Sequence, residues 1–232
     1  MLKRILAGVL LGSVFFAAAC VTTQKLPAPG RPPAAWRGPE IWEPDIAGFA
    51  KADEAGFPPA NAVLFMGSSS IRLWDLKKYF PGLSAVNRGF GGSYISDSAY
   101  YASRIAVPYK PRLIVFYSGD NDIADNKPPD RLAADFEGFL AAAREKSPRL
   151  PVIYISIKPS PARWALWPKM REANGLIEAS CLRQPPCSYL DVGKAMLDGD
   201  GKVRTELFMQ DGLHLNGQGY LLWSALLTPL LN

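Results

Sequence analysis

The chain of 232 residues contains a single histidine, His214, and only three cysteines. A zinc site built from protein ligands needs several such side chains, so we expect neither a metal nor another cofactor. Imidazole-based proton transfer near neutral pH would have to use His214. The net charge is only +5, and the basic residues are scattered among acidic ones. This pattern argues against nucleic-acid binding, which needs a clustered basic face.

The one long apolar run, residues 5–19, follows Lys3 and Arg4 at the N-terminus. It is too short for a comfortable transmembrane helix and is typical of a targeting segment. Three alanines then precede Cys20, which resembles a bacterial lipobox with alanine at the usual leucine position. We therefore expect a cell-envelope protein anchored to a membrane by lipidated Cys20. The alternative is an ordinary signal peptide and a soluble periplasmic or secreted protein.

Residues 21–44 contain six prolines and almost no periodic apolar pattern, as expected for a semi-rigid spacer. Trp36, Ile41 and Trp42 are exceptions that could dock the end of the spacer on a folded part. The remaining residues, 45–232, are enough for one domain with a substantial core. The sequence thus predicts a signal peptide at 1–20, a linker at 21–44 and one domain from residue 45.

Short apolar runs alternate with helical patterns throughout the domain. This alternation predicts a three-layer α/β/α sandwich with a central, mainly parallel, five-stranded sheet, similar to a flavodoxin-like fold. Apolar spacing predicts helices over 131–145 and 220–231. The expected strands are 62–66, 84–86, 113–117, 152–157 and 188–190.

Polar or glycine-rich motifs follow the first three expected strands, where α/β proteins bind their ligands. Residues 67–70 read Gly-Ser-Ser-Ser, residues 87–93 are rich in glycine, and residues 118–122 contain Asn121. A serine at a helix start has free backbone N–H groups beside it that can face an anionic oxygen. Each motif alone is weak evidence for a functional site, because most serine-rich helix starts are only helix caps and most glycine-rich turns are only turns. Together with Asp211-Gly-Leu-His214 they form a strong signal.

These blocks, in this order and spacing, resemble the SGNH hydrolases of the GDSL esterase and lipase superfamily, over residues 61–230. The resemblance implies that Ser69 is the nucleophile, His214 the general base and Asp211 the residue that orients the imidazole. Ser68 stands where many members have aspartate. The alignment of Gly67 favours Ser69 over the neighbouring serines.

The resemblance also implies an oxyanion hole made of the backbone N–H groups of Ser69 and Gly92 and the side-chain amide of Asn121. Asp120 and Asp122, which flank this asparagine, are expected to hydrogen-bond to loop backbone. The implied reaction is hydrolysis of an ester through a covalent acyl-enzyme. No extended apolar lid sequence is present, which favours short acyl groups such as acetyl.

Two other functions stay open at this stage: an acyltransferase that modifies a cell-envelope sugar, and an inactive envelope-binding lipoprotein. The loop after the fourth strand carries Arg163 and Trp164, which we expect to contact a small-molecule or glycan ester, although packing is as common a role for tryptophan. Arg72 and Trp74 are expected to pack the first helix. Cys181 and Cys187 can pair in an oxidising compartment or remain thiols.

Overall fold

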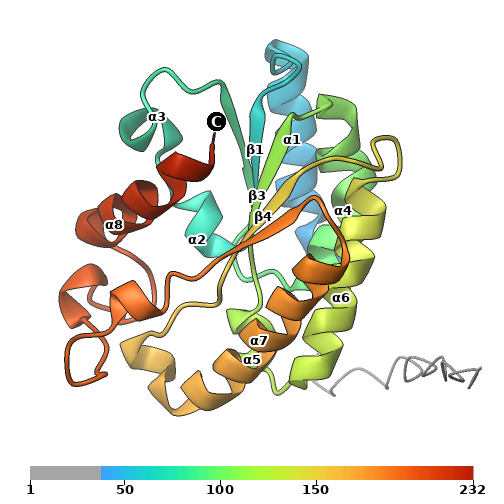
Figure 1. The fold of residues 1–232 in the computed structure, drawn as a ribbon. Helices are drawn as coiled ribbons and strands as arrows, with labels where there is room; N and C mark the ends of the chain where they lie inside the picture. Colours follow the sequence, from blue (N-terminus) through green and yellow to red (C-terminus); the bar gives the residue numbers. More distant parts are fainter. Residues whose placement is uncertain (1–37, 232) are drawn as a thin grey trace, which may run out of the picture. The chain divides into compact units, whose positions relative to one another are not determined.

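The computed structural model describes residues 38–231. These residues contain a five-stranded sheet in the order β2-β1-β3-β4-β5, and every neighbouring pair is parallel (Figure 1). The fold class predicted from the sequence is therefore confirmed. The strands are β1 (Val63–Gly67), β2 (Ala85–Gly89), β3 (Leu113–Tyr117), β4 (Val152–Ile155) and β5 (Cys187–Leu190).

Helices cover both faces of the sheet, as Figure 1 shows. In β1, Leu64 and Met66 join the core under one layer, whereas Val63 and Phe65 join the core under the other. Both sets are fully buried, which explains why the strand sequences are continuous apolar runs. One layer contains α1 (Glu43–Ala55), α4 (Ile95–Ile105), α6 (Pro129–Ala143) and α7 (Trp167–Arg183), and the other contains α2 (Ser69–Arg72), α3 (Leu76–Tyr79) and α8 (Gly217–Leu227).

Short elements complete the connections between strands and helices. The helix α5 follows β3 directly, at the carboxyl end of the sheet. Helix α8 begins earlier than the apolar spacing indicated, because the Asn216 side chain accepts hydrogen bonds from the N–H groups of Gln218 and Gly219. The short elements are α5 (Asp120–Ala124), η1 (Pro39–Trp42), η2 (Val107–Tyr109), η3 (Pro161–Leu166), η4 (Lys194–Met196), η5 (Thr205–Leu207) and η6 (Thr228–Leu230).

The folded domain begins before residue 45, the start that was predicted from the sequence: η1 begins at Pro39 and α1 at Glu43. Pro39 lies at the beginning of η1 and Pro44 at the beginning of α1, positions that proline favours because its missing N–H has no helical partner there. The Trp42 indole donates to Asp97 Oδ2 at 2.9 Å and its ring packs against Phe90. The linker prediction was therefore too long at this end, because prolines that start helices resemble prolines of a spacer.

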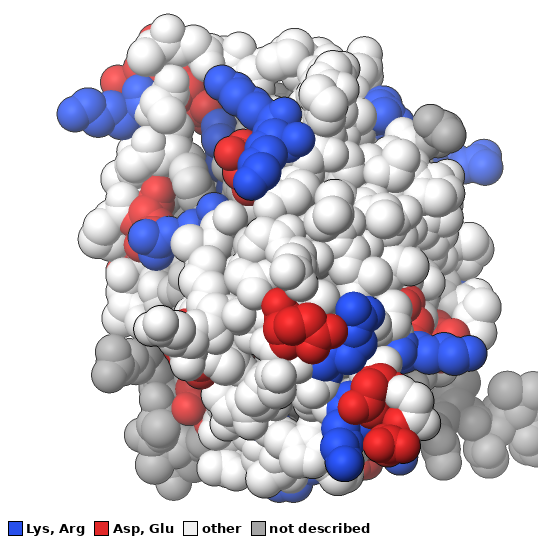
Figure 2. Space-filling model, turned by 90° about the vertical axis from the view of Figure 1, so that its left-hand side faces the viewer, with Lys and Arg blue, Asp and Glu red and all other residues white. Residues whose placement is uncertain are grey.

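The expected targeting segment, Cys20 and Trp36 lie outside the described residues. Within 38–231, no helix is both long and apolar enough to cross a membrane. On the face that carries α3 and α8, basic and acidic side chains lie in small mixed groups (Figure 2).

Cys181 and Cys187 are joined by a disulfide bond. Cys181 lies in the last turns of α7, and Cys187 begins β5. The bond therefore closes the turn that leads from this helix back to the edge strand. The other cysteine of the chain, Cys20, is not among the described residues.

Candidate active site

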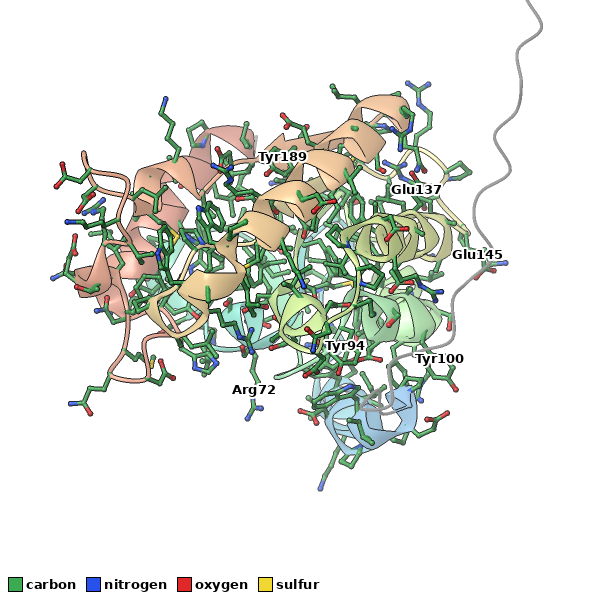
Figure 3. All side chains as sticks on the ribbon, turned by 90° about the horizontal axis from the view of Figure 1, so that it is seen from below. Arg72, Tyr94, Tyr100, Glu137, Glu145 and Tyr189 are labelled. Carbon is green, nitrogen blue, oxygen red and sulfur yellow. A yellow bond between two sulfur atoms is a disulfide. The ribbon has the colours of Figure 1, made fainter. Side chains whose placement is uncertain are left out.

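The candidate site lies at the carboxyl end of the sheet, beyond the ends of β1, β2 and β3. Figure 3 views the domain from below, with Arg72 of α2 and Tyr94 at the start of α4 labelled on this side. Helix α2 follows the end of the central strand β1, and α4 follows the end of its neighbour β2. This is the position at which open α/β sheets bind their ligands.

The turn after β1 requires glycine at position 67. Gly67 has a φ of +132°, and a Cβ atom there would lie 1.8 Å from the carbonyl oxygen of Tyr117. That same oxygen accepts the N–H of Ser68 at 3.0 Å, and Gly67 O accepts the N–H of Phe90 at 2.9 Å. The turn is thus fixed to the ends of both neighbouring strands. It directs the chain into α2, whose first residue is Ser69.

The structure separates the three consecutive serines by their surroundings. Ser68 and Ser70 are buried, and neither hydroxyl has a hydrogen-bond partner among residues 38–231. Ser69 is only partly buried, and its Oγ lies 3.0 Å from Nε2 of His214. This contact favours Ser69 as the nucleophile.

His214 is held by Asp211 on the opposite side of its ring. Nδ1 of His214 lies 2.6 Å from Oδ2 of Asp211. Because a carboxylate only accepts hydrogen bonds, the neutral imidazole carries its proton on Nδ1 here and presents Nε2 to Ser69 as an acceptor. The other Asp211 oxygen accepts the N–H groups of Leu213 and His214. These hydrogen bonds, led by the one from His214, lower the pKa of Asp211 to about 2. Asp211 is therefore a carboxylate at neutral pH, as the role of orienting partner requires.

Three potential oxyanion donors come from three different strand ends. Within residues 38–231, nothing accepts the backbone N–H of Ser69 or Gly92. Gly92 has a φ of +81°, which glycine adopts without strain. Asn121 Nδ2 donates to Ser93 O at 3.1 Å, which ties the asparagine to the loop of Gly92. One hydrogen of this amide stays available for a substrate oxygen.

A buried group of charges lies beneath Asn121. The Asp120 carboxylate is 5% exposed and contacts Lys158 Nζ at 3.3 Å and Arg163 Nη1 at 3.0 Å. Burial raises the pKa of Asp120, but the two cations outweigh it and hold that pKa below its usual value. Lys158 is itself buried, which lowers the pKa of its ammonium group. A backbone hydrogen bond also lowers the pKa of Asp120, in line with the expected backbone contact, but the expectation did not include the two cations, which are distant in the sequence.

A second buried ion cluster supports the same loop. Asp122 Oδ1 accepts from Lys127 Nζ at 2.6 Å, and the same ammonium lies 2.9 Å from Asp135 of α6. Asp122 Oδ2 also accepts the backbone N–H of Ile95 at 3.3 Å, in agreement with its expected backbone contact. Lys127 and Asp135 were not among the residues predicted from the sequence. The cluster connects α5 to the start of α4 and to α6.

The two expected substrate contacts differ in their surroundings. The Arg163 side chain is 18% exposed, and its guanidinium contacts Asp120 and Asn121 of its own chain. Trp164 is 41% exposed, and its ring stacks on Trp167 with 6.4 Å between centroids. Their contact with a substrate stays a prediction.

The expected packing of the first helix is correct for Trp74 and wrong for Arg72. Trp74 is buried against Phe65 and Trp223. Arg72, by contrast, is exposed, and Figure 3 shows its side chain extending away from the domain. Arg72 is the last residue of the single-turn helix α2, and its long side chain points to solvent, whereas the indole of Trp74 is buried in the core.

A serine that contacts a histidine, which in turn contacts an aspartate, defines the class of serine-dependent hydrolases when oxyanion donors lie beside the serine. The GDSL-like Lipase/Acylhydrolase family matches residues 72–222, which is more than half of the chain. The chain therefore belongs to this family and is a carboxylic ester hydrolase of the GDSL/SGNH type. The match begins three residues after Ser69, so the role of this serine rests on its geometry. A comparison with curated proteins found no match.

Several solved structures share the fold at low sequence identity. A Streptococcus pneumonia protein named for platelet activating factor has a TM-score of 0.72 and 20% identity, over 83% of this chain and 94% of its own. A GDSL-like lipase from Bacteroides thetaiotaomicron has a TM-score of 0.69 and 22% identity, over 80% and 96%. A family 3 carbohydrate esterase from Talaromyces cellulolyticus has a TM-score of 0.57 and 19% identity, over 73% and 95%.

Proposed function

We propose that this protein is a serine esterase that hydrolyses short-chain acyl esters, acetyl esters above all, with Ser69, His214 and Asp211 as its catalytic triad. The observation that carries the proposal is the position of His214. One ring nitrogen lies 3.0 Å from the Ser69 hydroxyl, and the other lies 2.6 Å from the Asp211 carboxylate. An imidazole held in this way can both remove and return a proton.

In the first step, Ser69 Oγ attacks the ester carbonyl carbon while His214 Nε2 takes the hydroxyl proton. The carbonyl oxygen becomes an oxyanion that the N–H groups of Ser69 and Gly92 and the Asn121 amide stabilise. The tetrahedral intermediate then expels the alcohol, which leaves with the proton from His214. In the second step, water attacks the acyl-serine carbonyl carbon while His214 Nε2 takes a proton from the water. The second tetrahedral intermediate then breaks its bond to Ser69 Oγ, which recovers its proton from His214, and the carboxylic acid is released.

The acetyl preference rests on the lack of an extended apolar lid sequence. The alcohol part is proposed to be a sugar, because Trp164 is 41% exposed in the loop after β4. An exposed indole face is suited to stacking on a sugar ring. The Talaromyces cellulolyticus neighbour is a carbohydrate esterase. A panel of p-nitrophenyl esters of graded chain length, together with acetylated sugars, tests both parts of this proposal.

Lipidation of Cys20 would place this esterase at a membrane surface of the cell envelope. The support for this anchor is the basic start, apolar run and Ala-Ala-Ala-Cys sequence of the first residues. Incorporation of labelled fatty acid, compared between the full-length protein and Cys20→Ala, tests it. If the variant is labelled and retained in the membrane fraction as well as the wild type, Cys20 is not the anchor.

Labelling with a fluorophosphonate tests the nucleophile, because only an activated serine reacts with it. We expect labelling of the wild type and loss of labelling in Ser69→Ala. Ser68→Ala and Ser70→Ala are matched controls from the same turn and should keep the label. Labelling of Ser69→Ala would overturn the assignment. Product analysis with and without an added sugar then separates transfer to water from transfer to a sugar hydroxyl.

A further inference from the structure

Arg163 hydrogen-bonds to Asn121, the residue whose side-chain amide is assigned to the oxyanion hole. Its Nη2 donates to Asn121 Oδ1 at 3.0 Å, while its Nη1 lies 3.0 Å from Asp120 Oδ2. The guanidinium thus spans two consecutive residues of the loop after β3. Its position 42 residues further along the chain hides this relation in the sequence.

The partners of Asn121 determine which end of its amide faces the substrate. A guanidinium can only donate hydrogen bonds and a backbone carbonyl can only accept them. Asn121 must therefore present Oδ1 to Arg163 and Nδ2 to Ser93 O, as the contacts at 3.0 and 3.1 Å show. If Arg163 were absent, only the bond to Ser93 would oppose rotation of the amide. A rotated amide would present an oxygen to the developing oxyanion.

Arg163 is itself fixed by charges in the protein interior. Asp120, which it contacts, is 5% exposed and is also paired with Lys158, whose side chain is 1% exposed. Lys158 additionally donates to the hydroxyl of Tyr117 at the end of β3. Asp120 Oδ1 and Arg163 Nη1 make no hydrogen bond among residues 38–231, so the guanidinium is held by charge attraction to Asp120 Oδ2 and by its hydrogen bond to Asn121. The guanidinium is therefore held in place before any substrate binds.

The turn that carries Arg163 also contacts the loop of the triad. Ala162 N donates to Gly212 O at 3.0 Å, and a Cβ atom at Gly212 would lie 3.2 Å from Cβ of Pro161. Gly212 lies between Asp211 and His214 in the chain. One short segment, η3, thus connects the loop of the base with the amide of the oxyanion hole.

We propose that Arg163 is a positioning residue, which fixes and polarises the Asn121 amide so that its free N–H meets the oxyanion. A cation bonded to Oδ1 withdraws electron density from the amide and makes Nδ2–H a stronger donor. The effect appears as charge develops in the transition state, so it changes kcat rather than substrate affinity. This inference rests on the proposed esterase function and on the role of Asn121 in it.

A double-mutant cycle on p-nitrophenyl acetate tests the proposal. Arg163→Met removes the donors and keeps most of the side-chain volume, and we expect kcat to fall about tenfold with KM changed less than about twofold. Asn121→Ala should lower kcat about a hundredfold. In the double variant, loss of Arg163 should add less than about a twofold further decrease, because its target is absent. Each rate is divided by the fraction of the protein that reacts with fluorophosphonate, so that a smaller amount of folded enzyme is not mistaken for a lower kcat.

Two further variants complete the experiment. Arg163→Lys keeps a cation beside Asp120 and one donor for Asn121, so it should recover part of the lost kcat. If Arg163→Met does not fold, the lysine variant replaces it in the cycle. Its smaller loss in kcat should likewise disappear when Asn121 is alanine. Arg171→Met is the matched control, because Arg171 is exposed on α7 and makes no ion pair within residues 38–231. Its kcat and KM should equal those of the wild type.

The proposal is overturned if the two losses in kcat multiply, since Arg163 would then act independently of Asn121. It is also overturned if Arg163→Met raises KM and leaves kcat unchanged, which would indicate direct contact with substrate. Failure of the esterase function looks different. In that case the wild type does not hydrolyse p-nitrophenyl acetate, or Ser69→Ala hydrolyses it as fast as the wild type, whatever the outcome of the cycle.

Discussion

Nε2 of His214 lies 3.0 Å from Oγ of Ser69, although 145 positions separate the two residues in the chain. Ser69 begins the helix after β1, and His214 lies in the loop that precedes α8. Neither local segment could create this contact alone. The proposed chemistry therefore depends on correct packing of the first and last parts of the domain.

Replacing His214 or Ser69 with alanine should lower kcat for p-nitrophenyl acetate by about four orders of magnitude or more. The chain has no second histidine that could take over as base. Both side chains are partly exposed, so the circular dichroism spectrum and melting temperature should stay close to those of the wild type. A folded variant that retains more than a few per cent of wild-type kcat would refute its assignment.

Asn121→Ala should lower kcat by about two orders of magnitude with little change in KM, because the lost donor acts in the transition state. Asn174→Ala provides a contrasting control. Its side chain is buried and exchanges hydrogen bonds with both backbone groups of Ile157. The control should therefore lower the free energy of unfolding, measured in urea, and affect the folded enzyme's kcat much less. A reversed pattern would contradict the oxyanion role.

Gly67→Ala should destabilise the protein by about 4 kcal/mol or more, because backbone strain and a steric clash combine at this position. The new Cβ would lie 1.8 Å from a backbone oxygen that cannot move without displacing β3. Gly175→Ala is the matched control, since a Cβ atom there meets nothing within 4 Å. Because Gly175 lies in the interior of α7, Gly175→Ala should stabilise the protein by about 0.5 to 1 kcal/mol. Urea unfolding measures both changes, and equal changes would contradict the steric argument.

Asp211 should make the stability of the protein dependent on pH in the acid range. Its pKa falls from 3.8 to about 2 on folding. Its stabilising contribution is therefore complete above the unfolded value and disappears as pH falls through the folded value. Asp211→Asn cannot titrate, so the stability difference between wild type and variant should shrink between pH 4 and pH 2. The midpoints of urea unfolding across this pH range measure the stability difference between wild type and Asp211→Asn. A stability difference that does not change with pH would show that the pKa of Asp211 is not lowered.

The sheet was predictable because its strands are buried on both faces and read as separate apolar runs. The turn at Gly67 was predictable from its local sequence, and the pair Asp211 and His214 from the resemblance of its sequence block to the SGNH hydrolases. Other parts of the site were not. The sequence does not show that Lys158 and Arg163 meet Asp120, because such pairs depend on how segments that are distant in the chain pack together. The start of the domain was misplaced for a different reason, since proline serves both spacers and helix starts.

Trp42 connects the start of the domain to the loop that carries Gly92, a proposed oxyanion donor. Its indole bonds to Asp97, and its ring lies where a Cβ atom of Gly92 would approach to 3.2 Å. A fragment that begins at Asp45 would lack this tryptophan and leave one side of the Gly92 loop uncovered. The shortest fragment that retains full activity should therefore still include Trp42. The catalytic rate of N-terminally truncated fragments should therefore depend on whether they retain Trp42.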